Sequence, residues 1–306
     1  MNSIKSVSLW ALLLVCSFIA VYRISHVSDR EMSWDVLGYY LYLPATFIYD
    51  QPMLDDIAWL QKINQEKDLT GTLYQVSTND EGEPMYFFLM GMSLLYLPFF
   101  LAGHATAGIA GYPVDGFSMP YQYAMVIGGI LYTIIGLIYF RKNLSIFFSD
   151  KLTALILLLI VFGTNYIHHL TLKNLETVNM LFMLVNIVLW NTIRWHETYR
   201  LKNMAAIGVA VMVTTLVKPS EVFVVLLPLF WNVSSFKSFK QKIQLFWQRR
   251  NQVIIAAGLA LLIALPQMLY WYFKTGHIIY DSYKNPGVGL DIFSPHIINV
   301  LFSYRK

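Results

Sequence analysis

The chain has 306 residues, of which 57% are hydrophobic, 16% aromatic and only 13% charged. Soluble domains typically carry roughly 25% charged residues, so this composition excludes an ordinary soluble fold. The net charge of +4 is modest, and nothing in the sequence supports nucleic-acid binding. Several nearly uncharged stretches are close in length to the about 20 residues that a helix needs to cross a hydrocarbon layer. We therefore expect an all-α, multi-pass membrane protein.

The first apolar segment, residues 6–22, resembles a secretory signal because Lys5 precedes it. Its apolar run is long, however, and Arg23 follows without a small-residue cleavage site, which favours an uncleaved first span. Cys16, the single cysteine of the sequence, lies inside this segment. The sequence therefore predicts neither a disulfide nor a cysteine-based zinc site.

Residues 23–85 form a long acidic connection. Most of the 18 acidic residues of the chain lie in it: Asp29, Glu31, Asp35, Asp50, Asp55, Asp56, Glu66, Asp68, Asp80, Glu81 and Glu83. The stretch DDIAWLQKINQ spaces Ile57, Leu60 and Ile63 at helical intervals, which predicts a short helix. We expect an extracytoplasmic loop that contains short interfacial helices.

The apolar segment at 86–108 is ambiguous. Pro98 lies near its middle, and its glycines, such as Gly91 and Gly103, weaken a straight helix. If this segment crossed the membrane, the basic pair Arg141–Lys142 would face outward, against the positive-inside rule. We therefore expect a re-entrant or interfacial segment on the outer side. In the alternative, residues 36–49 cross instead and the acidic loop lies inside.

The remaining spans are expected within residues 121–306. Their approximate limits are 121–140, 152–167, 177–193, 204–217, 222–233 and 253–273. Three connections rich in Lys and Arg, near residues 141–151, 194–202 and 237–250, should be cytoplasmic. The chain stops at YRK soon after IINVLFS. We expect residues 1–306 to form one transmembrane domain that is the front part of a longer protein.

The stretch SWDVLGYYLYLPA places Asp35 directly before a tyrosine-rich apolar run. One interpretation is a solvated loop acid, because loop charges are usually solvated. The other is a catalytic acid at the outer interface, since tyrosines favour that depth and a carboxylate there can accept a proton from a substrate hydroxyl. Tyr39 and Tyr40 are candidate substrate contacts on the same stretch.

Glu176 opens the span at 177–193, at its outward end. The first turn of a helix favours an acid by roughly 0.3–1 kcal/mol through the helix dipole, so capping is one interpretation. A catalytic role is the other, because ionisable groups at membrane depth are usually functional.

Basic residues near the outer ends of two spans are candidate phosphate contacts. Lys218 lies with Glu221 in VKPSEV, where a plain turn followed by a helix with Pro219 at its start is an equal interpretation. Arg305 lies in the terminal YRK. His168 and His169 are sequence neighbours, which point about 100° apart on a helix and cannot easily share a metal. No metal site is predicted and no cofactor is indicated, although a divalent cation is compatible with this chemistry.

The order of these features resembles the GT-C superfamily of membrane glycosyltransferases, which includes protein O-mannosyltransferases and lipid A aminoarabinose transferases. The likeness covers most of the chain: one span, a long outer loop opening with an acid, an apolar segment beginning EPMYFF, and a second acid after a later outward crossing. The stretches GYYLYLPA, LLYLPFF, DGFSMPYQ, FGTNY, VKPSEV and LFSYRK look closer to uncharacterised bacterial members.

The resemblance implies a polyprenyl-phosphate-linked sugar as donor and a lipid, glycan or protein acceptor on the outer face of the inner membrane. By resemblance Asp35 is the base on the acceptor hydroxyl, Glu176 the second acid, and Lys218 and Arg305 the groups that neutralise the leaving phosphate. The family often has two adjacent acids where this chain has Asp35 and Val36, so Glu176 is the remaining candidate partner. The rival function is a non-enzymatic transporter of lipid-linked glycans or a scaffold for envelope assembly.

Overall fold

The computed structural model describes residues 6–283 and 297–302, and it is mostly helical. Five of the described helices are long and apolar enough to cross a membrane, which is compatible with a multi-pass membrane protein. They are α1 (Val7–Ser25), α5 (Gly91–Ile109), α6 (Met119–Phe147), α9 (Thr177–Thr198) and α13 (Arg250–Thr275).

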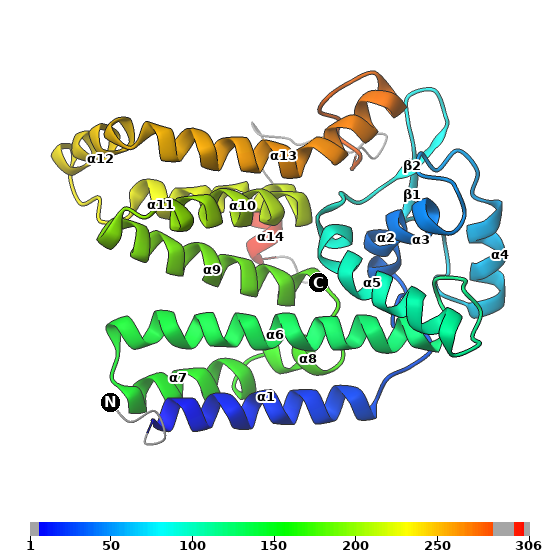
Figure 1. Ribbon diagram of the computed structural model, residues 1–306, viewed down its shortest axis with the longest axis horizontal. Helices are drawn as coiled ribbons and strands as arrows, with labels where there is room; N and C mark the ends of the chain where they lie inside the picture. Colours follow the sequence, from blue (N-terminus) through cyan, green and yellow to red (C-terminus); the bar gives the residue numbers. More distant parts are fainter. Residues whose placement is uncertain (1–5, 284–296, 303–306) are drawn as a thin grey trace.

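Figure 1 shows a helical bundle with a lobe at one end. In the bundle, α1, α6, α9, α13 and the shorter α10 (Leu201–Val217) run roughly side by side. The lobe comprises residues 26–118. The three connections rich in Lys and Arg lie at the opposite end (Figure 1), which we call the basic end. Successive connections therefore alternate between an acidic end and a basic end, as the distribution of charge in the sequence indicated.

Two predicted spans are divided in the structure. Instead of one helix at 152–167, α7 (Asp150–Phe162) ends in the GTN stretch after Phe162, and α8 (Tyr166–Thr171) follows. Instead of a span at 222–233, a 3₁₀ helix, η2 (Pro219–Val225), leads into the short α11 (Leu226–Phe230). Pro219 begins this stretch and Pro228 lies within α11, and proline disrupts regular α-helical hydrogen bonding. The amphipathic α12 (Phe236–Gln248) then leads into α13.

The lobe contains α2 (Asp35–Tyr40), α3 (Tyr42–Phe47) and α4 (Ala58–Lys67). The helix predicted from DDIAWLQKINQ is thus confirmed. The helical prediction did not include one small element: β1 (Val76–Thr78) and β2 (Pro84–Tyr86) form an antiparallel hairpin in which Ser77 pairs with Met85. The hairpin turn includes Gly82 with a φ of +85°, a conformation that glycine adopts without steric cost.

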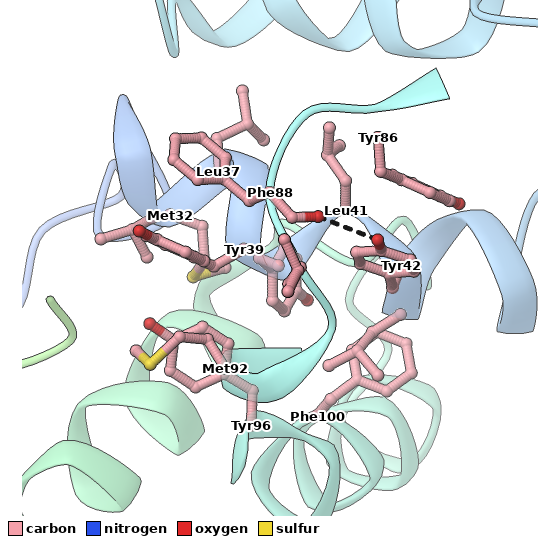
Figure 2. Packing of buried hydrophobic residues seen from close by; sticks show 14 of the residues in the cluster. Met32, Leu37, Tyr39, Leu41, Tyr42, Tyr86, Phe88, Met92, Tyr96 and Phe100 are labelled. Carbon is pink, nitrogen blue, oxygen red and sulfur yellow. Dashed lines mark hydrogen bonds between the residues drawn. The ribbon is translucent and has the colours of Figure 1, made fainter. Parts of the chain in front are cut away.

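Aromatic side chains fill the core of the lobe. Tyr42 stacks on Tyr86 with ring centroids 3.8 Å apart, and its hydroxyl donates to the carbonyl of Phe88 at 2.9 Å (Figure 2). Tyr86 in turn contacts Tyr270 of α13, whose hydroxyl accepts from the Tyr86 backbone N–H at 3.0 Å. The core is therefore continuous from the lobe into the bundle, so that the bundle holds the lobe in place.

The segment predicted to be re-entrant is a continuous helix, α5, despite its internal Pro98. It begins where α10 ends: a Cβ at Gly91 would lie 2.3 Å from the carbonyl carbon of Leu216, an approach that only glycine permits. From there α5 follows the first half of α6, where the Tyr132 hydroxyl donates to the Leu95 carbonyl at 2.7 Å. Figure 1 places α5 within the lobe, next to α2 and α3. That residues 86–108 do not cross the membrane stays a prediction.

Candidate functional site

Asp35 lies at the first residue of α2, immediately after a strained turn. Trp34, the residue before it, has a φ of +53°, which is uncommon for a bulky side chain and is often found at functional sites. Two hydrogen bonds hold this turn: the Trp34 backbone N–H donates to the Leu69 carbonyl at 3.2 Å, and the Gln75 side chain donates to the Trp34 carbonyl at 2.9 Å. These two bonds thus fix the direction in which the Asp35 side chain points from the backbone.

The Asp35 carboxylate is exposed and accepts a hydrogen bond from another part of the loop. The Tyr74 hydroxyl donates to its Oδ1 at 2.5 Å. Within the described residues, Oδ2 of Asp35 carries no hydrogen bond. One oxygen is therefore oriented by a phenol while the other stays open to a ligand.

Glu176 occupies the N-cap position of α9 but does not act as a cap, because its side chain makes no hydrogen bond to the helix backbone. The carboxylate turns toward the α8–α9 connection instead. Its Oε1 accepts from Lys173 Nζ at 2.6 Å, and its Oε2 lies 3.7 Å from Nδ1 of His169. Burial lowers the pKa of His169, so the imidazole is neutral at pH 7 and Lys173 is the cation that balances Glu176.

Asp35 and Glu176, from segments far apart in the chain, both act electrostatically on the same two tyrosines. The pKa of Tyr39 is raised mainly by burial, and further by the charges of Asp35 and Glu176. The pKa of Tyr74 is raised by burial, by its hydrogen bond to Asp35 and again by Glu176. Both phenols therefore stay protonated at neutral pH and can donate hydrogen bonds. The structure brings the two predicted acids into one region, where the lobe meets the bundle.

A polar cavity of about 330 Å³ borders this region. Its lining includes Trp34 and Val36, the two neighbours of Asp35, together with Glu176. The remaining lining residues are Arg23, His26, Ser28, Arg30, Glu31, Ser33, Leu172, Lys173 and Leu175. The cavity combines carboxylates with cationic side chains, which suits a ligand that carries hydroxyl and phosphate groups.

A buried ion pair forms one wall of the cavity. Arg23, in the last turn of α1, donates to Glu31 at 2.6 Å, with side-chain exposures of 3% and 9%. Its Nε also donates to the Asn174 side chain at 3.0 Å. The side-chain amide of Asn179 donates to the Asn174 carbonyl at 3.0 Å and to the Thr133 hydroxyl at 2.8 Å. This network ties the cavity wall to α1, α6 and α9.

The two candidate substrate contacts after Asp35, Tyr39 and Tyr40, are packed against other residues of the lobe. Tyr39 is 8% exposed and packs on Phe88 with ring centroids 4.3 Å apart. Tyr40 is fully buried, and its hydroxyl donates to the Gly116 carbonyl at 2.5 Å. Tyr39 can therefore contribute through its hydroxyl, on which both acids act electrostatically, whereas Tyr40 presents no surface to a ligand and packs in the lobe core.

Lys218 and Glu221, the candidate substrate contacts in VKPSEV, are not among the residues that line the cavity. Lys218 is exposed at the end of α10, and Glu221 follows in the first turn of η2, where its backbone N–H donates to the Lys218 carbonyl at 2.9 Å. In the part of the chain that the structure covers, neither side chain has an ion-pair partner. Through the contact of Gly91 with α10, Lys218 lies at the lobe end. Arg305 lies outside the described residues.

Three contributors to the site were not predicted from the sequence. Lys173 lies three residues before Glu176, a spacing that could have indicated the ion pair. Tyr74 and Glu31 lie in irregular loops, where no periodicity indicates which way a side chain points. No group of three or more His, Cys, Asp or Glu side chains suited to a metal ion occurs within residues 6–283 and 297–302.

Comparison with known proteins adds no relative. No family model matches the chain, and neither a curated protein nor a solved structure matches it.

Proposed function

We propose that this protein is a membrane glycosyltransferase that moves a sugar from a polyprenyl-phosphate carrier to a lipid, glycan or protein acceptor at the outer face of the membrane. The observation that carries the proposal is a polar cavity whose lining combines Glu176 with both sequence neighbours of Asp35, the acid whose carboxylate Tyr74 orients. The resemblance of the chain to the GT-C superfamily supplies the donor class.

In the proposed reaction, an acceptor hydroxyl attacks the anomeric carbon of the sugar. The bond between that carbon and the phosphate oxygen breaks, and the electron pair leaves with the lipid phosphate. Asp35 accepts the acceptor proton on Oδ2 while Tyr74 holds Oδ1. A positioned base of this kind typically contributes roughly 10²–10⁴-fold in rate.

The other residues have supporting roles in this proposal. Glu176, balanced by Lys173, orients the sugar or acceptor hydroxyls next to Asp35. Lys218, exposed at the same end of the bundle, neutralises the leaving phosphate by charge. Tyr39 donates a hydrogen bond from its protonated hydroxyl. A divalent cation next to the phosphate is compatible with this arrangement but is not needed for the proton transfer.

The test compares wild type with Asp35→Asn and Asp50→Asn in lipid nanodiscs. Each sample receives a panel of labelled polyprenyl-phosphate sugars with membrane-extract acceptors, and donor consumption is measured. Asp50 is a matched control because it is an exposed lobe acid with a φ of +53°, a conformation that Asn also tolerates.

We expect Asp35→Asn to lose at least roughly 10²-fold in rate and Asp50→Asn to keep the wild-type rate, with all three proteins unfolding at the same temperature. Equal rates for all three would overturn the role of Asp35. If folded wild type consumes no donor of the panel, the transferase proposal fails and the transporter or scaffold alternative gains support.

A further inference from the structure

The amphipathic helix α12 at the basic end has three distinct faces, and the proposed transferase function accounts for none of them. Its N-terminus is fixed by a capping box. The Ser235 hydroxyl accepts from the Ser238 backbone N–H, and the Ser238 hydroxyl accepts from the Ser235 backbone N–H. Such a box defines where a helix begins independently of tertiary contacts. The helix then presents each side chain at about 100° from the last.

The first face docks on the bundle. Lys242 is 8% exposed, and its Nζ lies 2.5 Å from Nε2 of His196 in α9. The ring of Phe246 stacks on Trp195 with centroids 5.5 Å apart and an interplanar angle of 9°. These contacts fix how α12 is rotated about its axis. The direction of the other two faces is therefore set by the fold.

The second face is an exposed apolar stripe. Phe236 is 73% exposed, Ile243 55% and Trp247 71%. These positions and Lys240 lie within about 60° of one another around the helix. Burying such exposed apolar side chains away from water is favourable. We therefore expect another apolar surface to cover the stripe.

The third face is polar and borders the stripe on the side away from the docked face. It carries Lys237, Gln241, Gln244 and Gln248, all exposed. A helix with an apolar stripe between a docked face and a polar face is typical of helices that lie in the plane of a membrane interface. The neighbouring α13, long and apolar enough to span, begins directly after α12, so that the stripe is held near the expected membrane boundary.

Along the chain, the charged residues on both sides of this stripe are all basic. No Asp or Glu occurs between Glu221 and Asp281 in the sequence. The Nζ of Lys240 lies 4.8 Å from the ring centroid of Phe236, and the guanidinium of Arg250 lies 5.7 Å from that of Trp247. Cations that rest on exposed rings stay unpaired with carboxylates, and they lie where an interfacial helix meets lipid phosphates.

We propose that α12 lies in the membrane interface at the basic end, with Phe236, Ile243 and Trp247 among the acyl chains, and that Lys237, Lys240 and Arg250 bind the headgroups of anionic phospholipids. The occupant of the stripe is thus lipid, and neither a second copy of the chain nor a soluble protein. This inference does not depend on the transferase function.

The first experiment tests the position of the stripe. In a Cys16→Ala background, Trp247→Cys and Gln244→Cys are each labelled with an environment-sensitive fluorophore in the full chain and reconstituted in nanodiscs. Gln244 is the matched control because it lies on the polar face of the same helix turn. We expect brominated phospholipid to quench the label at position 247 several-fold more strongly than the label at position 244.

Equal quenching at the two positions would overturn the interfacial placement. So would protection of the label at position 247 that depends on protein concentration, because a second copy would then cover the stripe. Matching unfolding temperatures of the labelled proteins establish that both variants keep the fold.

The second experiment tests the headgroup preference. Retention of phosphatidylglycerol over phosphatidylcholine in mixed micelles is measured by native mass spectrometry for wild type and for the triple variant Lys237→Gln, Lys240→Gln and Arg250→Gln. The control triple variant, Lys142→Gln, Lys151→Gln and Lys202→Gln, removes the same charge elsewhere at the basic end. We expect the α12 variant to lose at least roughly tenfold in preference and the control to lose much less. Equal losses would overturn the assignment to α12.

Discussion

The cations at the two ends of the bundle have different partners. At the lobe end they pair with carboxylates, as in the Arg23–Glu31 pair at 2.6 Å and the Lys274–Asp55 pair at 2.7 Å. At the basic end several lie over aromatic rings, as Lys240 does over Phe236 at 4.8 Å, although Arg194 there also pairs with Glu197 at 2.6 Å.

This difference shows what each end can do. Charges paired in a desolvated setting fix side chains in place, which a reaction site requires. Cations on exposed rings remain available to phosphates of the surrounding lipid. We therefore propose that the lobe end is organised to hold a ligand and the basic end to contact the bilayer.

Breaking the buried ion pair should have the largest effect on stability. In Arg23→Met the Glu31 carboxylate, 9% exposed, loses its cation, and we expect a loss of about 3–5 kcal/mol in the free energy of unfolding. The control is Arg30→Met, because the Arg30–Asp68 pair is exposed (43% and 81%) and should contribute at most about 1 kcal/mol. Denaturant unfolding in detergent micelles measures both. Equal losses would mean that burial does not distinguish these pairs.

Separating the lobe from the bundle should have the next largest effect. The new methyl group of Gly91→Ala would lie 2.3 Å from the backbone of α10, so we expect a loss of about 1–3 kcal/mol from overpacking. Gly108→Ala, in the same helix with nothing within 4 Å of its Cβ position, should instead gain up to about 1 kcal/mol. Unfolding of the two variants under identical conditions tests the opposite signs. A neutral Gly91→Ala would contradict the close approach of α5 and α10.

Asp150 is an acid at the basic end that several protein groups bind. Its carboxylate accepts from the hydroxyls of Ser6 and Ser8 at 2.7 and 2.5 Å and from the Val7 backbone N–H at 2.6 Å. These bonds lower its pKa to about 2. A carboxyl whose pKa is lowered by folding stabilises the folded state above its unfolded pKa, and that stability is lost as the pH falls through the folded pKa.

We therefore expect Asp150→Asn to unfold a few degrees below wild type at pH 5–8, and the gap to close between about pH 4 and pH 2. Thermal unfolding of both proteins as a function of pH measures the gap. A gap that stays constant down to pH 2 would show that the carboxylate charge is not what binds the start of α1.

The smallest effect belongs to an exposed cation over aromatic rings. Lys142 lies over Tyr139 and, at 5.5 Å, over Trp190. Lys142→Gln should lose about 0.5–1 kcal/mol, while Lys151→Gln at the same end should lose nothing measurable. Unfolding at low and high salt compares the two variants. A loss larger than that of Gly91→Ala would contradict the expectation that contacts at the lobe end stabilise the fold more than those at the basic end.

Much of the arrangement followed from patterns that are local in sequence. Hydropathy located the helices of the bundle, the charge of the loops sorted them to two ends, and the spacing of Leu60 and Ile63 indicated α4. Asp35 and Glu176 could be selected because each interrupts or opens an apolar run. Their common surroundings could not be predicted, because they depend on how an irregular loop packs on the bundle.

The predictions failed where short-range chemistry decides the structure. The β1–β2 hairpin has three-residue strands, too short for an alternating pattern to stand out. The Tyr74–Asp35 hydrogen bond joins two turns of the loop, and turns have no periodicity from which a side-chain direction follows. The buried state of Tyr40 was missed because a tyrosine is equally suited to an interface and to a core whose carbonyls accept its hydroxyl.

The central claim is that Asp35 and Glu176 act at one site. The measurement that tests it most directly is a double-mutant cycle on kcat/KM for sugar transfer, with Asp35→Asn, Glu176→Gln and both together. We expect each single variant to be slower than wild type, and the double variant to lose far less than the product of the two single losses. A loss equal to that product, or a Glu176→Gln variant with the wild-type rate, would contradict a shared site.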